Sequence, residues 1–379
     1  SSDVCSSDLG GGSDTIIFDT ELTSADIVDG GAGLDELRFT DSNGASDDLD
    51  QVSNVEVITL GNSETSVITK DSLVAGGQTL TVTAVGLTGT NSLTWDGSAE
   101  TDGKFTITGS AHKDTIMGGA GEDTFVLGTN LSSEDIIDGG DGSDTLYFKD
   151  NGLATSDLDG VTNVETVTLG DAATSITTKD SLLSSGQTLT VNAAALTGAN
   201  SLIWDGSAES NAKFNIIGSS QSDLIVGGDQ ADIIFGDTGA DTIRGGQGND
   251  QLHFSNGSSF GAATTVDGGQ GYDTIYFDEN GITNLNDTAF ENVSNIEAIV
   301  LSDGNNNFAL GENAKLASSS EFISITTGDG DDIIDVRGLD NSTTIYAGGG
   351  SDVILFGNKL SADDIVDGNG GSEIGRAHV

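Results

Sequence analysis

Aspartate recurs at a fixed spacing in this 379-residue sequence. The clearest run, residues 218–253, reads GSSQSDLIV, GGDQADIIF, GDTGADTIR and GGQGNDQLH, with aspartate sixth and an aliphatic residue eighth in each nonapeptide. Carboxylates that meet backbone carbonyls at close range form an all-oxygen site, which suits calcium. Magnesium keeps its waters and prefers strict octahedral geometry, so it is the weaker candidate. Zinc requires histidine or cysteine, which the pattern does not supply.

The same unit recurs outside this run, at 30–38, 109–126, 139–147, 268–276, 327–335 and 347–355. The aspartates predicted to bind several calcium ions are Asp14, Asp35, Asp114, Asp123, Asp135, Asp144, Asp223, Asp232, Asp241, Asp250, Asp273, Asp332 and Asp352. The alternative is that they are only turn residues, because aspartate and glycine are common in turns. That alternative has more weight for isolated, degenerate units such as 327–335.

The elements that must position these aspartates follow from the nine-residue unit, which divides into a six-residue loop and a three-residue strand. Glycine supplies the positive-φ conformations that a tight loop needs. The strand points its aliphatic residue inward and its neighbours outward. Two nonapeptides make one coil, so residues 18 apart should stack, Asp223 over Asp241 and Asp232 over Asp250. We therefore predict an all-β fold, a right-handed parallel β-roll or β-solenoid.

Some coils are longer. Three-residue insertions precede the units holding Asp26, Asp135 and Asp364. Each insertion should enlarge one loop and leave the aspartates of the neighbouring loops stacked, Asp123 on Asp144 and Asp14 on Asp35. The segments 52–108 and 161–217 lack aspartate loops but keep short β-rich runs such as VEVITL and KFTITGS. We predict that they form further solenoid rungs without metal.

The tandem units match GGxGxDxUx, where U is a large aliphatic residue, and so resemble the repeats-in-toxin (RTX) family of hemolysin-type calcium-binding repeats. The resemblance covers about half of the chain. It implies export in an unfolded state by type I secretion from a Gram-negative bacterium, followed by folding in external calcium. An extracellular location, secreted or on the cell surface, is therefore expected.

A longer period overlies the short one. DIVDGGAGLDEL at 26–37 returns as DIIDGGDGSDTL at 135–146, and NSLTWDGSAE at 91–100 returns as NSLIWDGSAE at 200–209. Three modules and the start of a fourth are predicted. Module 1 spans 10–108, with repeats at 10–38 and metal-free rungs at 52–108, and module 2 spans 109–217, with repeats at 109–147 and metal-free rungs at 161–217. Module 3 spans 218–326, with repeats at 218–276 and diverged rungs at 293–326, and module 4 starts at 327–372. One continuous solenoid fits such an array better than separate globular domains.

The two ends do not fit the repeat. DVCSSDL at 3–9 and EIGRAHV at 373–379 can be encoded by DNA strands that are reverse complements of each other, as a sequencing adapter read at both ends would produce. Residues 1–9 and 373–379 are therefore predicted to be adapter-derived, and the protein is expected to be part of a longer chain. The single cysteine, Cys5, falls in this segment, so disulfides and thiol chemistry are not expected.

The chain carries 61 acidic and 12 basic residues, a formal net charge of -49. Nucleic acids and anionic membranes are therefore not expected as partners, because both require a positive surface. No apolar run approaches the roughly 20 residues of a membrane-spanning helix. Such charge opposes a compact state unless cations bind. Disorder is disfavoured because the hydrophobic residues, 35% of the chain, fall at regular positions.

HExxH and the Walker loop are absent, and the GGxG loops never complete GxGxxG. Trp95 and Trp204 could form a carbohydrate platform, but core packing is the favoured interpretation. The pairs Asp96/Glu100 and Asp205/Glu209 resemble glycosidase carboxylates, yet their recurrence beside turn residues favours a structural role. His112 and His253 occupy variable positions and are expected to face solvent.

We therefore predict a non-enzymatic, calcium-binding structural region of a large secreted or surface-attached bacterial protein of the adhesin or biofilm kind. The alternative is the repeat region of a secreted toxin, protease or lipase whose catalytic domain lies outside this sequence. A metal-independent spacer is a third possibility, distinguished by its indifference to chelator. A cell-surface or carbohydrate ligand is left open.

Overall fold

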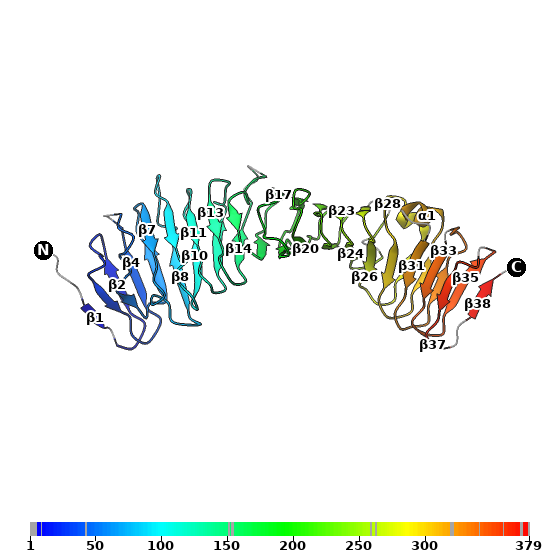
Figure 1. Cartoon of the computed structure of the whole chain (residues 1–379), viewed down its shortest axis with the longest axis horizontal. Coiled ribbons are helices and arrows are strands. Elements are labelled where there is room, and N and C mark those ends of the chain that lie inside the picture. Colours follow the sequence, from blue (N-terminus) through cyan, green and yellow to red (C-terminus); the bar gives the residue numbers. More distant parts are fainter. Residues whose placement is uncertain are drawn as a thin grey trace. The chain divides into compact units, whose positions relative to one another are not determined.

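The chain folds into two compact units, Ser1–Leu189 and Thr190–Val379, and in each of them short parallel strands lie side by side (Figure 1). This computed structural model describes residues 6–8, 10–41, 44–150, 152, 155–257, 260–261, 264–318, 322–340, 342–358, 360–371 and 374–377. Successive strands of the chain alternate between sheets, so that the polypeptide winds as a solenoid.

In the first unit the longest sheet contains β2 (Thr15–Phe18), β4 (Glu36–Phe39), β6 (Val57–Leu60), β8 (Thr79–Thr83), β10 (Lys104–Thr108), β12 (Thr124–Gly128), β14 (Thr145–Phe148) and β16 (Thr166–Leu169). The strands between them form one sheet of β1 (Ser6–Asp8), β3 (Ile27–Asp29) and β5 (Val52–Ser53), and another of β7 (Thr65–Ile68), β9 (Leu93–Asp96), β11 (Thr115–Met117), β13 (Ile136–Asp138) and β15 (Val161–Thr162). The strands β17 (Thr174–Thr177) and β18 (Thr188–Asn192) follow along the chain.

The second unit repeats this plan. Its longest sheet contains β20 (Lys213–Ile217), β22 (Ile233–Asp237), β24 (Gln251–Phe254), β26 (Thr274–Phe277), β29 (Ala298–Leu301), β31 (Phe322–Thr326), β33 (Ser342–Tyr346) and β36 (Ile365–Asp367). The strands between them form three further sheets. One contains β19 (Leu202–Asp205), β21 (Leu224–Val226), β23 (Thr242–Gln247), β25 (Thr265–Gln270) and β28 (Val293–Ser294). Another contains β27 (Thr283–Leu285), β30 (Asn307–Ala309), β32 (Ile333–Asp335), β35 (Val353–Gly357) and β38 (Ile374–Ala377), and the third is a short pair of β34 (Gly349–Gly350) and β37 (Gly370–Gly371).

The register confirms the predicted coil. In the tandem run Leu224 pairs with Thr242 and Ile233 with Gln251, a step of two nonapeptides. Where a three-residue insertion is present, the step lengthens, as in the pairing of Thr124 with Thr145. The segments without aspartate loops also form parallel rungs, because β8 pairs with both β6 and β10.

Side chains alternate between the core and the surface along each strand, as a period of two requires. On β10, for example, Phe105 and Ile107 are buried while their neighbours are partly exposed. Trp95 is fully buried and meets Phe105 edge to face at 5.6 Å. Trp204 meets Phe214 in the same way at 5.7 Å. The prediction that both tryptophans pack in the core is confirmed, so neither can form a carbohydrate platform on the surface.

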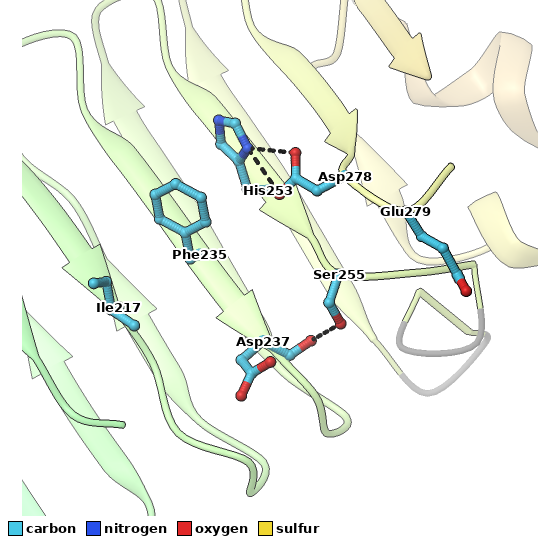
Figure 2. Close-up of a pocket in the computed structure, with 7 residues that line it drawn as sticks. All are labelled: Ile217, Phe235, Asp237, His253, Ser255, Asp278 and Glu279. Atoms are coloured by element: carbon cyan, nitrogen blue, oxygen red, sulfur yellow. Dashed lines mark hydrogen bonds and ion pairs between the residues drawn. The ribbon is translucent and has the colours of Figure 1, made fainter. Parts of the chain in front are cut away.

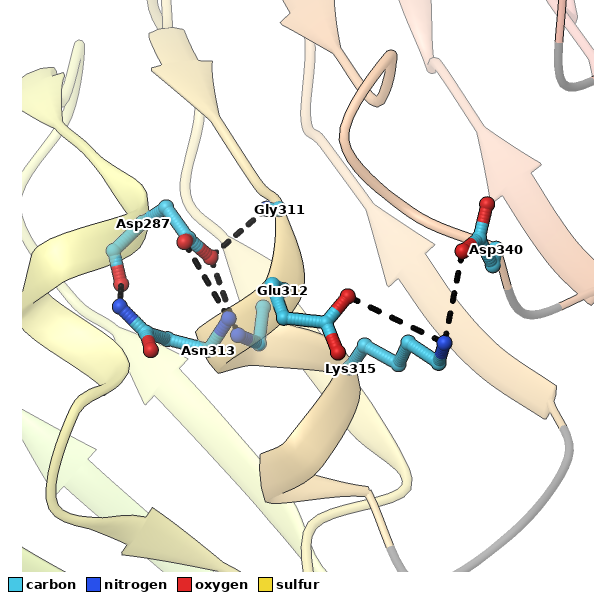
Figure 3. A network of polar contacts seen from close by, with 7 residues as sticks. Asp287, Gly311, Glu312, Asn313, Lys315 and Asp340 are labelled. Carbon is cyan, nitrogen blue, oxygen red and sulfur yellow. Dashed lines mark hydrogen bonds and ion pairs between the residues drawn. The ribbon is translucent and has the colours of Figure 1, made fainter.

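A short helix of the second unit, α1 (Glu312–Ala317), packs against the 3₁₀ helix η1 (Asp287–Phe290) (Figure 3). The Asp287 carboxylate accepts hydrogen bonds from the N–H groups of Gly311, Asn313 and Ala314, at 2.7, 3.2 and 3.0 Å. These are amides that the start of a helix leaves without internal partners. Asp287 therefore caps the helix from the preceding coil.

The predicted all-β parallel solenoid is confirmed. The module boundaries stay a prediction. The strands β1 and β38 fall within the terminal segments attributed to an adapter, whereas Cys5 and His378 lie outside the described residues. None of the helices formed by the described residues combines the length and apolar character that crossing a bilayer requires.

Candidate calcium sites

The sixth-place aspartates form a ladder that runs from coil to coil. The Asp232 N–H donates to Asp250 Oδ1 at 2.8 Å, and the Asp250 N–H donates to Asp273 Oδ1 at 2.8 Å. The same bond joins Asp14 to Asp35, Asp114 to Asp135, Asp123 to Asp144, Asp223 to Asp241 and Asp332 to Asp352, at 2.7–3.0 Å. The predicted stacking is thus present, while metal binding by these thirteen residues stays a prediction.

Glutamate continues this aspartate ladder where the nonapeptides stop, and the sequence analysis missed it. The N–H groups of Asp35, Asp144 and Asp273 donate to the carboxylates of Glu56, Glu165 and Glu297, at 2.8–2.9 Å. A sequence signal was available, because each glutamate recurs in the segments SNVEV, TNVET and SNIEA. Glutamate has one methylene more than aspartate, so from a rung without the glycine loop its carboxylate can still reach the aspartate N–H of the preceding coil.

The second carboxylate oxygen divides the loops into two kinds. In four of them Oδ2 accepts the N–H of the second residue of its own loop, at 2.6–2.8 Å. We call these closed loops, and their aspartates are Asp114, Asp123, Asp223 and Asp232. Asp135 behaves similarly, because its Oδ2 accepts the N–H and hydroxyl of Ser132.

In the other kind, the carboxylate keeps one buried oxygen without a partner among the described residues. We call these open loops, and their aspartates are Asp14, Asp35, Asp144, Asp241, Asp250, Asp273 and Asp332. Each has glycine at its fourth place with φ between +116° and +154°, at Gly12, Gly33, Gly142, Gly239, Gly248, Gly271 and Gly330. The closed loops have His112, Gly121, Gln221 and Gln230 there, none of them in the left-handed region. A left-handed fourth residue therefore accompanies the unpaired oxygen.

The electrostatics of the open loops oppose a bare carboxylate. Burial first, and the neighbouring carboxylates of Asp232 and Asp273 second, raise the pKa of Asp250 to about 8. The pKa values of Asp144 and Asp241 are raised to about 7, again by burial first and by neighbouring carboxylates second. Each group is almost fully buried. A buried carboxylate of this kind requires either a proton or a cation.

The first glycine of an open loop marks where a cation would be held. A Cβ placed on Gly245 would lie 2.2 Å from Asp250 Oδ2 and 2.4 Å from the carbonyl oxygen of Gly268, in the next coil. Because Gly245 has no side chain, an unpaired carboxylate oxygen and a carbonyl oxygen can both approach its Cα. Such a set of hard oxygen donors fits calcium. The ion would supply positive charge between the coils and neutralise the ladder.

A comparison with known protein families agrees with this geometry. The family model described as the RTX calcium-binding nonapeptide repeat matches in four copies, over residues 106–128, 132–149 and 217–257. The chain carries RTX calcium-binding repeats. The matched segments include RTX loops of both kinds, with closed Asp114 and Asp223 and open Asp144 and Asp250. No curated protein matches the chain.

The space beside the first glycine of an RTX loop can be tested directly. We expect Gly245→Ala to lower the free energy of unfolding in saturating calcium by more than about 2 kcal/mol, because the added methyl group would collide with Asp250 Oδ2 and the Gly268 carbonyl. Gly257→Ala is the control, since a Cβ there meets only Ile282 side-chain atoms at 3.5 Å or more. Urea unfolding of both variants measures the effect. Equal stability would contradict the close approach of these oxygens.

The outward face of the longest sheet carries a feature that the sequence analysis misjudged. His253 stacks between Phe235 and Tyr276, with ring centroids 4.3 and 4.6 Å from its own. Its Nδ1 lies 3.0 Å from Asp278 Oδ1 (Figure 2). Its side chain is only 14% exposed and borders a cavity of about 320 Å³. The expectation that His253 faces solvent is therefore wrong, because in-register rings of adjacent coils cover both of its faces. His112 is partly exposed.

Proposed function

We propose that the open RTX loops bind calcium between successive coils, and that the bound ions hold this chain as a structural segment of a secreted or surface-attached bacterial protein of the adhesin or biofilm kind. The observation that carries the proposal is the buried, unpartnered Oδ2 of Asp250 beside the Gly268 carbonyl. In this proposal the carboxylate ligands are the open-loop aspartates Asp14, Asp35, Asp144, Asp241, Asp250, Asp273 and Asp332.

The closed loops have a different role in the proposal. Both oxygens of Asp232 accept backbone N–H groups, those of Phe214 and Gly228. A carboxylate already committed in this way needs no ion to be satisfied. Asp114, Asp123, Asp135, Asp223 and Asp232 would therefore hold the coil together without being calcium ligands.

We further propose that the chain is not an enzyme. The carboxylates that resemble a glycosidase pair serve local turns: Asp96 Oδ1 accepts the N–H and hydroxyl of Ser98, and Glu100 Oε1 accepts the N–H of Gly103. An extracellular location is supported by the RTX repeats, which are typical of secreted proteins. External calcium would also neutralise part of the net charge of -49.

A calcium titration of the full chain tests the proposal. We expect far-ultraviolet circular dichroism to show a coil-like spectrum in chelator and a β spectrum at about millimolar calcium, the weak extracellular range. The reason is that metal binding becomes folding free energy when the unbound ligands repel one another. Magnesium at the same concentration is the control and should be much less effective. The same β spectrum in chelator as in calcium would identify a metal-independent spacer instead.

A further inference from the structure

A cluster of three carboxylates lies in the rungs predicted to be free of metal. Carboxylate oxygens of Asp71, Glu100 and Asp102 lie within 4.8 Å of one another. Asp71 belongs to the turn that follows β7, whereas Glu100 and Asp102 belong to the loop that follows β9 in the next coil. The cluster therefore bridges two coils, at a place with no glycine-aspartate nonapeptide.

The central member of the cluster is buried and incompletely paired. Glu100 is 1% exposed, and its Oε1 accepts the N–H groups of Gly103 and Asp102 at 3.0 and 3.4 Å. Its Oε2 is buried and has no partner among the described residues. A buried carboxylate oxygen without a partner is costly unless a cation or a proton satisfies it.

The two outer members are held in place by backbone contacts between the coils. Asp71 Oδ1 accepts the N–H and the hydroxyl of Thr101, at 3.0 and 2.5 Å. The Gly77 N–H donates to the Asp102 carbonyl at 2.8 Å, and a Cβ on Gly76 would lie 2.6 Å from Asp102 Oδ2. Both carboxylates are exposed, so solvent ions can reach them.

No basic side chain neutralises the cluster within the part of the chain that the structure describes. The two nearest lysines in sequence pair elsewhere, Lys70 with Asp50 and Lys104 with Glu122. Three carboxylates within 4.8 Å without a cation repel one another. All of the donors are hard oxygens, the kind that calcium takes from carboxylates and completes with water.

We propose that Asp71, Glu100 and Asp102 bind one calcium ion that joins two coils of the rungs between the RTX loops. This site shares no carboxylate with the RTX loops, although the Ala120 N–H of the next coil donates to the Glu100 carbonyl at 3.0 Å. The rungs around the site would therefore also depend on calcium. The corresponding position to Asp102 in the next 109-residue repeat is Asn211. The fold thus accepts asparagine at this place, which makes Asp102→Asn a suitable probe.

Equilibrium dialysis of the full chain against radioactive calcium, at about 1 mM free ion, tests the site. We expect Asp71→Asn/Asp102→Asn to bind one calcium ion fewer per chain than the wild type. Asp47→Asn, an exposed aspartate in the same unit, is the matched control and should leave the number unchanged. Circular dichroism in saturating calcium checks that each variant keeps its β spectrum.

Three outcomes decide the matter. An equal number of ions in the double variant and the wild type overturns the proposal, even if the wild type binds several. If the double variant loses its β spectrum, the test uses Asp102→Asn alone. In that variant, an unchanged number of bound ions together with unchanged amide exchange at 101–103 would also overturn the proposal. A wild type that binds no calcium at all would instead reject the proposed function of the RTX loops, and with it this site.

Discussion

Replacing Asp241, Asp250 and Asp273 together by asparagine should change the stability of the second unit in opposite directions with and without calcium. In calcium, the midpoint concentration for folding should rise by about tenfold or more, which corresponds to about 1.4 kcal/mol or more. In chelator near neutral pH, the variant should be more stable than the wild type. Asparagine keeps an Oδ1 for the aspartate ladder and removes three buried charges. At Asp250 the NH₂ group would also lie on the side of Gly245 that the Gly268 carbonyl approaches.

The closed loops provide the matched control. We expect Asp114→Asn/Asp223→Asn/Asp232→Asn to be less stable than the wild type both in calcium and in chelator. In these loops each carboxylate oxygen accepts an N–H, so an asparagine NH₂ would face a donor. A closed-loop triple variant that gains β structure in chelator, as the open-loop triple variant should, would contradict the division into open and closed loops.

Without calcium, the solenoid should be more stable at about pH 5 than at about pH 8.5. The pKa of Asp250 is raised to about 8, and those of Asp144 and Asp241 to about 7, from an ordinary value of 3.8. A carboxyl whose pKa is higher in the folded state binds its proton more tightly there. Its contribution to stability is therefore complete below about pH 4 and is lost progressively as the pH rises through about 7 to 8. Each pKa unit corresponds to about 1.4 kcal/mol per group, so the total change is on the order of several kcal/mol.

This pH dependence distinguishes the protein from one stabilised by ion pairs, whose stability falls on acidification. Because the chain is expected to be coil-like in chelator near neutral pH, the β signal that circular dichroism recovers in chelator between about pH 8.5 and pH 5 measures it. Saturating calcium should remove most of the dependence at neutral and higher pH, because the cation replaces the proton on the same oxygens. A chelated protein that loses stability between about pH 8.5 and pH 5 would show that these carboxyls are not held as buried, mutually repelling groups.

The period of the sequence was sufficient to predict the coil. Few other folds are compatible with aliphatic residues at every ninth place and glycines at the loop positions. The parallel pairing of Leu224 with Thr242 could therefore be expected. The burial of Trp95 and Trp204 also followed, since both recur at the same place in the repeat. Local patterns of this kind are repeated many times, and each copy supports the same interpretation.

Other features depend on atoms that one nonapeptide does not contain. Whether Asp232 or Asp250 keeps a free oxygen depends on the conformation of the fourth residue, Gln230 or Gly248, which the consensus treats only as a preference for glycine. The roles of Glu56 and Glu165 are set by the preceding coil, 21 residues away. The interpretation of 52–108 as metal-free considered only aspartate loops, and so overlooked carboxylates that meet from two turns.

The aspartate ladder has a direction. Every rung donates its N–H to a carboxylate that comes later in the sequence, as Asp232 does to Asp250 and Asp250 to Asp273. The backbone bonds beside the ladder run the other way, since the Gln251 N–H donates to the Asp232 carbonyl at 2.9 Å. A chain cut between two coils would therefore leave an aspartate N–H without its carboxylate acceptor at one edge and a carboxylate without that donor at the other.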